Sequence, residues 1–129
     1  MPVKFIVSPK KDPRDQEAAP KFYAIVKSNG RSDTNVVAKS INRMSTVSSV
    51  DTAAVLEAFL TVVPEELANG NIVELGDFGT FRVSVSSEGA EKAEDLTSRN
   101  ITDVRVLFTP GKRFKQVLDT AEFQKETLN

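Results

Sequence analysis

Residues 76–81 read GDFGTF and residues 108–115 read FTPGKRFK, and these two stretches decide the fold of the chain. The first sets two glycines among aromatic residues, a pattern typical of a bulge or tight bend next to a strand. The second places proline and glycine just before apolar residues at helical spacing, which predicts a helix start. The segment between them is long enough for a β-hairpin to leave the body of the protein and return.

Strand patterns flank both stretches. Residues 78–85 and 101–109 alternate apolar and polar side chains, and residues 72–75 read IVEL, so the sequence predicts an antiparallel sheet of three strands. Residues 86–100 are polar and nearly free of large apolar groups, which indicates a mobile loop. We therefore expect a protruding β-arm at about residues 84–104.

Helical periodicity precedes the sheet and follows it. A first helix is expected to begin at Asp33 or Thr34, and a second is expected to begin at Ser48, which has capping-box spacing to Asp51. Pro64 lies inside the second helix and predicts a kink or an early end. The last helix is predicted to start with Thr109 as N-cap and Pro110 at its first position.

The N-terminal residues form a separate segment. Residues 3–7 and 21–27 are rich in β-branched and aromatic residues, and a charged loop with three prolines joins them, so two paired strands are expected. We therefore divide the chain into an N-terminal β-strand extension, residues 1–32, and a second domain, residues 33–129. The total of 129 residues leaves little room for a second independent core.

Composition excludes several classes of function. The chain has no cysteine and no histidine, so it has no disulfide framework and no Cys/His zinc site. No apolar run approaches the roughly 20 residues of a membrane span, and the N-terminus lacks a signal-peptide core, so we expect an intracellular protein. Catalytic nucleophile motifs and a Gly-rich phosphate loop are also missing. We expect no enzyme activity, no cofactor, no metal and no small-molecule substrate.

Charge is unevenly distributed, although the net charge is only −1. Residues 1–31 have a surplus of basic side chains, residues 32–82 are acidic, and acidic groups gather at residues 88–95. Lys112, Arg113 and Lys115 crowd the start of the last helix, where the helix dipole favours anions over cations. A solvated basic turn is the simplest interpretation, and a phosphate held there by backbone N–H groups and cations is the alternative.

The two motifs, in this order of helices and strands, resemble the HU/IHF family of bacterial histone-like DNA-bending proteins. Members carry G-F-G-[TNS]-F in a body strand and F-x-P-G-[KQ]-x-[LF]-K at the last helix, and the resemblance covers about residues 33–118. The N-terminal strands and the stretch at 86–95 are similar to a divergent HU-related subfamily with an N-terminal extension. The resemblance implies an α+β fold, with two N-terminal helices, a three-stranded antiparallel sheet with its arm and a C-terminal helix, in an intertwined homodimer.

The same resemblance implies an architectural, nucleoid-associated protein that bends double-stranded DNA in the bacterial cytoplasm with little sequence specificity. Its phosphate contacts are expected from the arm, the arm base and the last helix, at Arg82, Lys92, Arg99, Arg105, Lys112, Arg113 and Lys115. Family arms are basic and carry a proline wedge near the tip, whereas this arm is rich in acids and has no proline between Arg82 and Thr109. Leu96 or Ile101 is a candidate substitute wedge, or a packed strand residue.

Those departures favour an alternative hypothesis, a dimeric protein-interaction module that keeps the HU-like fold with weak or no DNA affinity. The extension is open to two interpretations as well. It adds strands to a sheet edge, or its basic loop at Lys10, Lys11 and Arg14 supplies phosphate contacts that the arm has lost. Removal of residues 1–31 is expected to separate loss of folding from loss of DNA affinity.

Overall fold

The structure is a computed structural model that describes residues 2–15 and 17–126. Its contacts divide the chain into two compact units. One comprises Thr34–Val117, and the other combines Met1–Asp33 with Leu118–Asn129. The sequence placed residues 118–129 with the HU-like part, whereas in the structure they cluster with the N-terminal strands. The limits of the two domains stay a prediction.

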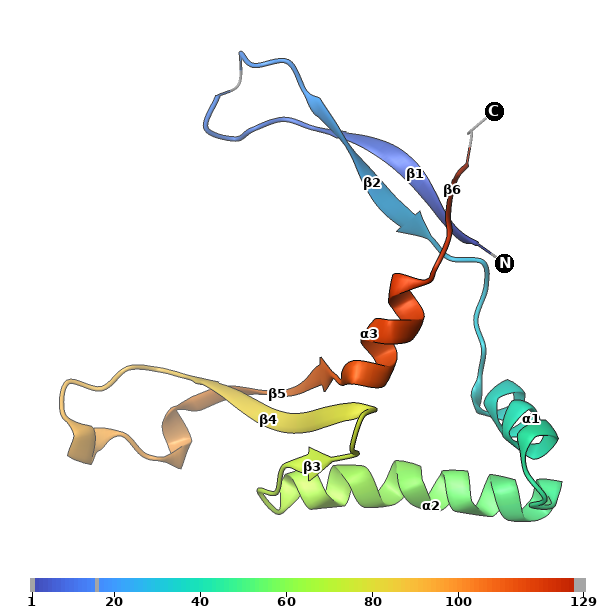
Figure 1. Ribbon diagram of the computed structural model, residues 1–129. Helices are drawn as coiled ribbons and strands as arrows, with labels where there is room; N and C mark the ends of the chain where they lie inside the picture. Colours follow the sequence, from blue (N-terminus) through green and yellow to red (C-terminus); the bar gives the residue numbers. More distant parts are fainter. Residues whose placement is uncertain (1, 16, 127–129) are drawn as a thin grey trace. The chain divides into compact units, whose positions relative to one another are not determined.

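Two helices open the larger unit. Helix α1 spans Thr34–Met44 and helix α2 spans Ser49–Ala68 (Figure 1). Ser48 caps α2 as predicted, because its hydroxyl oxygen accepts a hydrogen bond of 3.1 Å from the backbone N–H of Asp51. The cap satisfies one of the donors that the first turn of a helix leaves without a partner.

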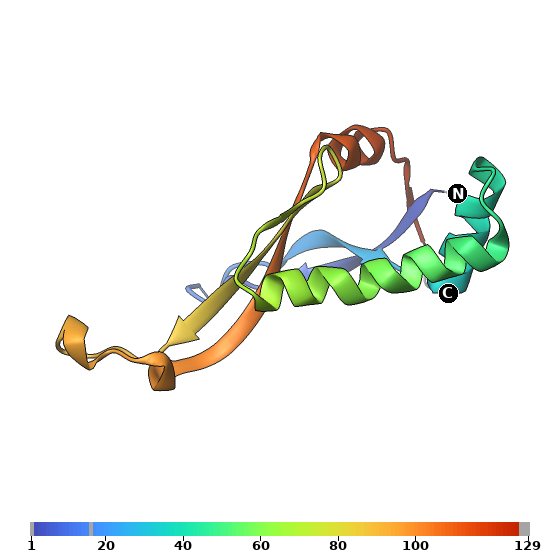
Figure 2. The same ribbon diagram turned by 90° about the horizontal axis from the view of Figure 1, so that it is seen from below.

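Helix α2 continues past Pro64 as one uninterrupted helix (Figure 2). The prediction of an early end at this residue is therefore wrong. The last turn is held by Leu67, which is buried at 7% exposure, and by a C-cap in which the N–H of Asn69 donates to the carbonyl of Glu65. Gly70 follows with a φ of 88°, which is the left-handed conformation typical after a helix end. These contacts outweigh the hydrogen bond that Pro64 cannot make.

The predicted antiparallel sheet of the larger unit is confirmed, in the order β3, β4, β5. Strand β3 spans Val73–Glu74, β4 spans Gly79–Ser87 and β5 spans Ile101–Pro110. Strands β4 and β5 pair from Gly79 opposite Pro110 to Ser87 opposite Ile101, with an irregularity between Ser86 and Ser87. Beyond β3 the two strands continue alone as the arm (Figure 1).

Two short 3-10 helices, Ala93–Asp95 and Ser98–Asn100, form the end of the arm. The second is closed by a capping box in which the side-chain oxygen of Asn100 accepts a 2.9 Å hydrogen bond from the N–H of Thr97. The N–H of Glu88 donates to the carbonyl of Asn100 at 2.8 Å and joins the two sides of the loop. Polar side chains and backbone groups thus define the turn at the arm end.

The two motifs meet in an aromatic cluster at the base of the arm. Phe78 and Phe81 of the first motif contact Phe108 at ring-centroid distances of 5.8 and 4.6 Å. Phe114 of the second motif contacts Phe78 at 4.7 Å and Phe108 at 5.4 Å. Aromatic pairs at such distances contribute beyond their buried area, so this cluster fastens the last helix to the sheet.

Helix α3 spans Lys112–Asp119 and begins later than predicted. Thr109 and Pro110 are the last residues of β5, so their predicted roles as N-cap and first helical residue are wrong. At the start of α3, backbone carbonyls of the turn before β4 accept the hydrogen bonds that a side-chain cap would otherwise accept. The N–H of Gly111 donates to the carbonyl of Phe78 at 2.9 Å, and the N–H of Arg113 donates to the carbonyl of Asp77 at 3.0 Å.

The smaller unit is a sheet in the order β2, β1, β6. Strand β1 spans Val3–Lys10 and pairs antiparallel with β2, Lys21–Lys27, which confirms both predicted strands. Strand β6, Phe123–Lys125, pairs in parallel with the start of β1 and was not predicted. The side chains of Lys27 and Glu126 form an ion pair of 3.0 Å beside this strand.

Little apolar surface is buried within this one chain. Among the described residues, Leu67 is the only hydrophobic side chain in the buried class, while Val55 and Phe59 of α2 are 67% and 40% exposed. No helix in the described part of the chain is sufficiently long and apolar to cross a membrane.

Candidate nucleic-acid interface

The β4–β5 arm has one apolar face and one polar face. Opposed residues on paired strands point to the same side, so the pairs Phe81 with Phe108, Val83 with Val106 and Val85 with Val104 share the apolar face. Arg82, opposite Leu107, and Arg105, opposite Ser84, lie on the other face. The structure therefore brings these two predicted cations together as diagonal neighbours on the polar face.

The guanidinium of Arg105 is held along the arm. Its Nη1 donates to Ser86 Oγ at 2.6 Å and to Asp103 Oδ2 at 3.1 Å. The ion pair with Asp103 is exposed, with side chains 46% and 59% accessible, so it contributes at most about 1 kcal/mol. A phosphate can compete with so weak a pair, and Arg105 stays available for a nucleic acid.

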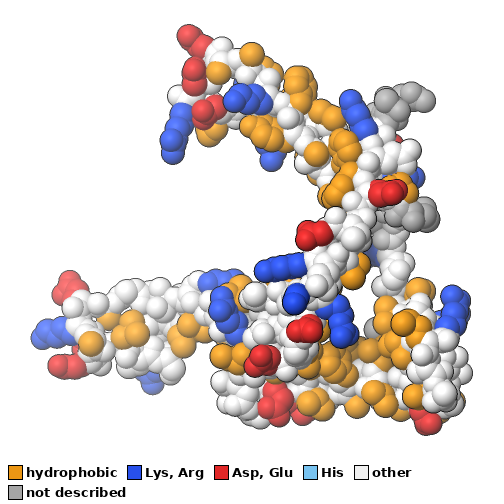
Figure 3. All heavy atoms as spheres, in the orientation of Figure 1, with side chains coloured by type: hydrophobic (Ala, Val, Ile, Leu, Met, Phe, Trp, Pro, Cys, Tyr) orange, Lys and Arg blue, Asp and Glu red, His pale blue; other side chains and the backbone are white. Residues whose placement is uncertain are grey.

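Lys92 and Arg99 lie at the arm end. Lys92 directly precedes the first 3-10 helix and Arg99 belongs to the second, and both are exposed. Glu94 and Asp95 lie in the first turn beside them, so acidic and basic side chains alternate there (Figure 3). The structure does not gather the two cations into a basic patch free of acids.

The two candidate wedge residues lie in different kinds of secondary structure. Ile101 is the first residue of β5 and lies opposite Ser87, so it is a strand residue. Leu96 lies between the two 3-10 helices, outside the strand pairing, and is 48% exposed, while Ile101 is 42% exposed. The assignment of a wedge to either residue stays a prediction.

Lys112, Arg113 and Lys115 occupy the first turn of α3, and all three are exposed. Phe114 lies on the other side of this turn, in the aromatic cluster, so the cations point away from it. The N–H groups of Gly111 and Arg113 already donate to carbonyls of residues 77 and 78. These two N–H groups are therefore already occupied, and the predicted phosphate held by backbone N–H groups and cations stays a prediction.

The cations of α3 follow the base of the arm directly in the sequence. Gly79 lies opposite Pro110 at the first pair of β4 and β5, and α3 begins two residues later. A Cβ added at Gly79 would lie 2.5 Å from the Phe108 ring, and one at Gly111 would collide with the carbonyl of Asp77. The glycines of both motifs thus permit the close approach that sets the cations of α3 at the arm base.

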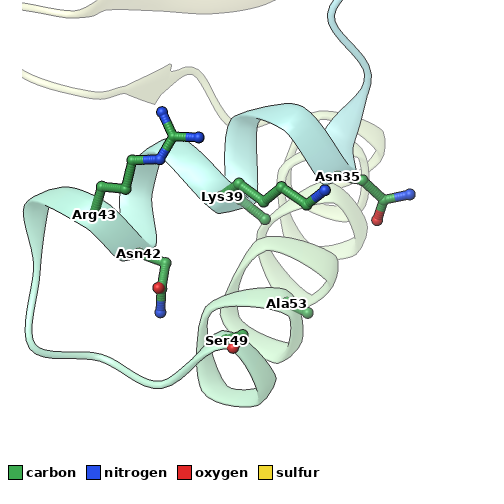
Figure 4. Close-up of a pocket in the computed structure, with 7 residues that line it drawn as sticks. Asn35, Lys39, Asn42, Arg43, Ser49 and Ala53 are labelled. Carbon is green, nitrogen blue, oxygen red and sulfur yellow. The ribbon is translucent and has the colours of Figure 1, made fainter.

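A hollow of about 470 Å³ that was not predicted lies beside α1 and the start of α2. Lys39 and Arg43 line it together with polar side chains, and no acidic residue lines it (Figure 4). The four-residue spacing of these cations on α1 was the signal available in the sequence. The other lining residues are Asn35, Ala38, Asn42, Ser49 and Ala53.

Comparison with protein families identifies the chain. Residues 1–125 match the model of the family described as an HU domain fused to wHTH, Ig, or Glycine-rich motif. The chain belongs to this HU-HIG family. The match includes the N-terminal strands, so the extension is part of the HU-HIG pattern.

Two solved structures resemble the fold of this HU-HIG chain. A crystal structure from Bacteroides vulgatus ATCC 8482, named as a candidate bacterial DNA binding protein, has a TM-score of 0.66 and 16% identity. The similarity covers 98% of this chain and 50% of that one, so this chain spans half the length of the Bacteroides protein. Anabaena HU in a cocrystal with DNA has a TM-score of 0.53 and 19% identity, over 69% of this chain and 99% of HU.

The structural similarity shows the HU-like fold. Identities this low do not assign roles to individual residues. No functionally curated protein matches the HU-HIG chain significantly.

Proposed function

We propose that this chain is an architectural DNA-binding module that contacts backbone phosphates of double-stranded DNA with little sequence specificity. The contacts come from Arg82 and Arg105 on the arm and from Lys112, Arg113 and Lys115 at the start of α3, with Lys92 and Arg99 at the arm end. A nucleoid-associated protein of the bacterial cytoplasm is the setting that fits this activity.

The observation that carries the proposal is the placement of cations around the arm base in an HU-like fold. Arg82 and Arg105 share the polar arm face, and the three cations of α3 follow the last residue of β5 after a single glycine. Long cationic side chains on exposed backbone suit phosphates, which carry no sequence information. The Anabaena cocrystal is consistent with DNA as the partner of such a fold.

We propose that the functional form is a homodimer. Helix α2 is apolar on most of its surface, and a hollow of about 260 Å³ beside α1 and α2 is lined by Ile41, Val55, Leu56 and Phe59 among others. A helix that is apolar all round needs burial against other protein. A second copy of the chain supplies it in the intertwined arrangement of HU proteins.

Fluorescence anisotropy tests the proposal, with the full chain titrated onto an intact duplex and onto a nicked duplex at low and physiological salt. We expect binding that weakens with salt and is tighter for the nicked DNA, which bends at lower cost. Replacement of Lys112, Arg113 and Lys115 by Gln removes three contacts from each copy of the homodimer, so the slope of log K against log salt should fall by about 5.4, at about 0.9 per phosphate contact.

A folded protein that binds neither duplex at low salt would contradict the proposal. That result would favour the interaction module, in which the acidic arm end meets a protein partner. The acids at residues 88, 91, 94 and 95 are the observation behind this second candidate.

A further inference from the structure

The smaller unit has a lysine face, defined here as the side of the β1–β2 sheet that carries Lys4, Lys10, Lys21 and Lys27. Lys4 lies opposite Lys27, and Lys10 lies opposite Lys21, so two cross-strand lysine pairs share one side. Like charges directly opposite each other destabilise a sheet. The stability of the sheet therefore does not account for the two lysine pairs.

The opposite side of the same sheet is apolar. Phe5 lies opposite Val26, Val7 opposite Ala24, and Val3 opposite Phe123 of β6. An apolar sheet face is normally covered by another layer of protein. The lysine face itself carries Ile6 opposite Ile25 and Ser8 opposite Tyr23 between its two lysine pairs, so its cations lie at the two ends of the ribbon.

An acid forms an ion pair with the lysine face at one end, where Glu126 pairs with Lys27. In the loop at the other end, Asp12 Oδ1 accepts from the N–H of Arg14 and Asp15 Oδ1 accepts from the N–H of Glu17, and both acids line the hollow that Lys10 and Lys21 also line. Within the described residues, the structure gives Lys10 and Lys21 no ion pair with an acid.

The loop end has the form of a binding surface. Lys10 Nζ lies 5.8 Å from the ring centroid of Tyr23 on the same face, an arrangement that orients the ammonium group. A hollow of about 510 Å³ there is lined by Lys10, Lys11, Lys21 and Tyr23 and also by Asp12 and Asp15. The structure thus combines an aromatic side chain with three cations and two acids at this end of the hairpin.

The shape of the hairpin favours DNA as the ligand. Strand β6 pairs only with Val3, Lys4 and Phe5, so the remainder of β1 and β2 is a two-stranded ribbon. The major groove of B-DNA admits a ribbon of this width. The two lysine pairs lie six positions apart along the strand, roughly 20 Å, which spans about six base pairs at 3.4 Å each.

We infer that the lysine face is a second phosphate-binding surface for double-stranded DNA, outside the HU-like unit, with Lys10 and Lys21 as its principal contacts. The inference rests on the proposed function, because it names an additional surface for the same ligand. It assigns the extension a binding role that the HU-like fold alone does not provide.

The test compares full-length variants in the same anisotropy titration. Lys10→Gln with Lys21→Gln removes two charges from the lysine face, and Arg31→Gln with Lys125→Gln removes two charges elsewhere in the same unit. Lys125 lies opposite Phe5 on the apolar side, which makes it a matched control. The pair Lys10→Arg with Lys21→Arg keeps the charge. Circular dichroism and thermal unfolding check that each variant is folded.

We expect the Lys10/Lys21 glutamine variant, which removes two contacts from each copy of the homodimer, to lower the salt slope by about 3.6, so that its affinity deficit shrinks about 150-fold between 50 and 200 mM salt. The arginine variant should bind as wild type does, and the control should keep the wild-type slope.

A glutamine variant with the wild-type slope, while wild type binds DNA, would overturn the inference and leave the proposed function standing. Equal losses in the control and the glutamine variant would also overturn it, because they would reflect net charge alone. Failure of wild type to bind any duplex would overturn the proposed function, and with it this inference. Phosphatidylserine vesicles provide a further arm. Loss of vesicle binding with unchanged DNA binding would assign the face to lipid and overturn the inference.

Discussion

Gly79 and Gly111 are the residues at which the two motifs touch, and both lack room for a side chain. A Cβ at Gly111 would collide with the carbonyl of Asp77, which accepts the N–H of Arg113. We expect Gly111→Ala to lower the free energy of unfolding by about 1–3 kcal/mol, the usual cost of overpacking, and thermal denaturation measures it. Gly89→Ala is the control, because nothing lies within 4 Å of its added Cβ. Equal losses in both variants would contradict the role of close approach.

We predict that Leu96 is the wedge of this arm, which has no proline. Its side chain is 48% exposed and lies between two 3-10 helices, outside the β4–β5 pairing. We expect Leu96→Ala to reduce the preference for nicked over intact duplex while the salt slope stays unchanged, because a wedge acts on stacking and leaves phosphate contacts intact. Ile101→Ala, which changes a strand residue, is the comparison. If only the Ile101 variant lost the preference, the assignment of the wedge to Leu96 would be wrong.

At the scale of elements, helix α2 contains Pro64 in its interior, where a proline is unfavourable. Pro64 removes the hydrogen bond to the carbonyl of Leu60, and interior proline costs about 3 kcal/mol relative to alanine. We expect Pro64→Ala to raise the free energy of unfolding by about 1–2 kcal/mol. The gain is smaller than the full cost of an interior proline because alanine also increases the entropy of the unfolded chain. Urea denaturation at fixed protein concentration measures this. Pro20→Ala, in the loop before β2, should lower the same quantity slightly, and a fall for Pro64→Ala would show that the helix needs its proline.

Alternation and capping were sufficient to predict β1, β2, β4, β5 and the start of α2, because each of those signals is local. Strand β6 escaped prediction, since three residues are too few for a period and its partner lies at the other end of the chain. The start of α3 was misplaced because Thr109 and Pro110 match a cap locally, while the groups that accept from the helix start come from Asp77 and Phe78. Alternation separated Arg82 and Arg105 from the apolar residues of their own strands, whereas the register that puts both on one face and the hydrogen bond from Arg105 to Asp103 required the structure.

At the scale of the molecule, the exposed apolar surface of α2 predicts that folding depends on association. We expect the melting temperature to rise with protein concentration and analytical ultracentrifugation to show a dimer, because a partner that binds only the folded chain stabilises it. Phe59→Glu should shift the protein to monomer and lower its stability, whereas Glu57→Gln on the same helix should change neither. A monomer with a concentration-independent melting temperature would refute the dimer.

The pairing of β1 with β6 also determines the order in which the protein can be completed during synthesis. The residues of β6 leave the ribosome after the whole HU-like unit, so β1 must wait until that unit has emerged before its sheet is complete. Deletion of residues 1–31 would remove the partner of β6 together with the lysine face. Point substitutions therefore test the lysine face more specifically. A nascent chain arrested before residue 123 should expose the edge of β1, where a chaperone or a second nascent chain can pair with it.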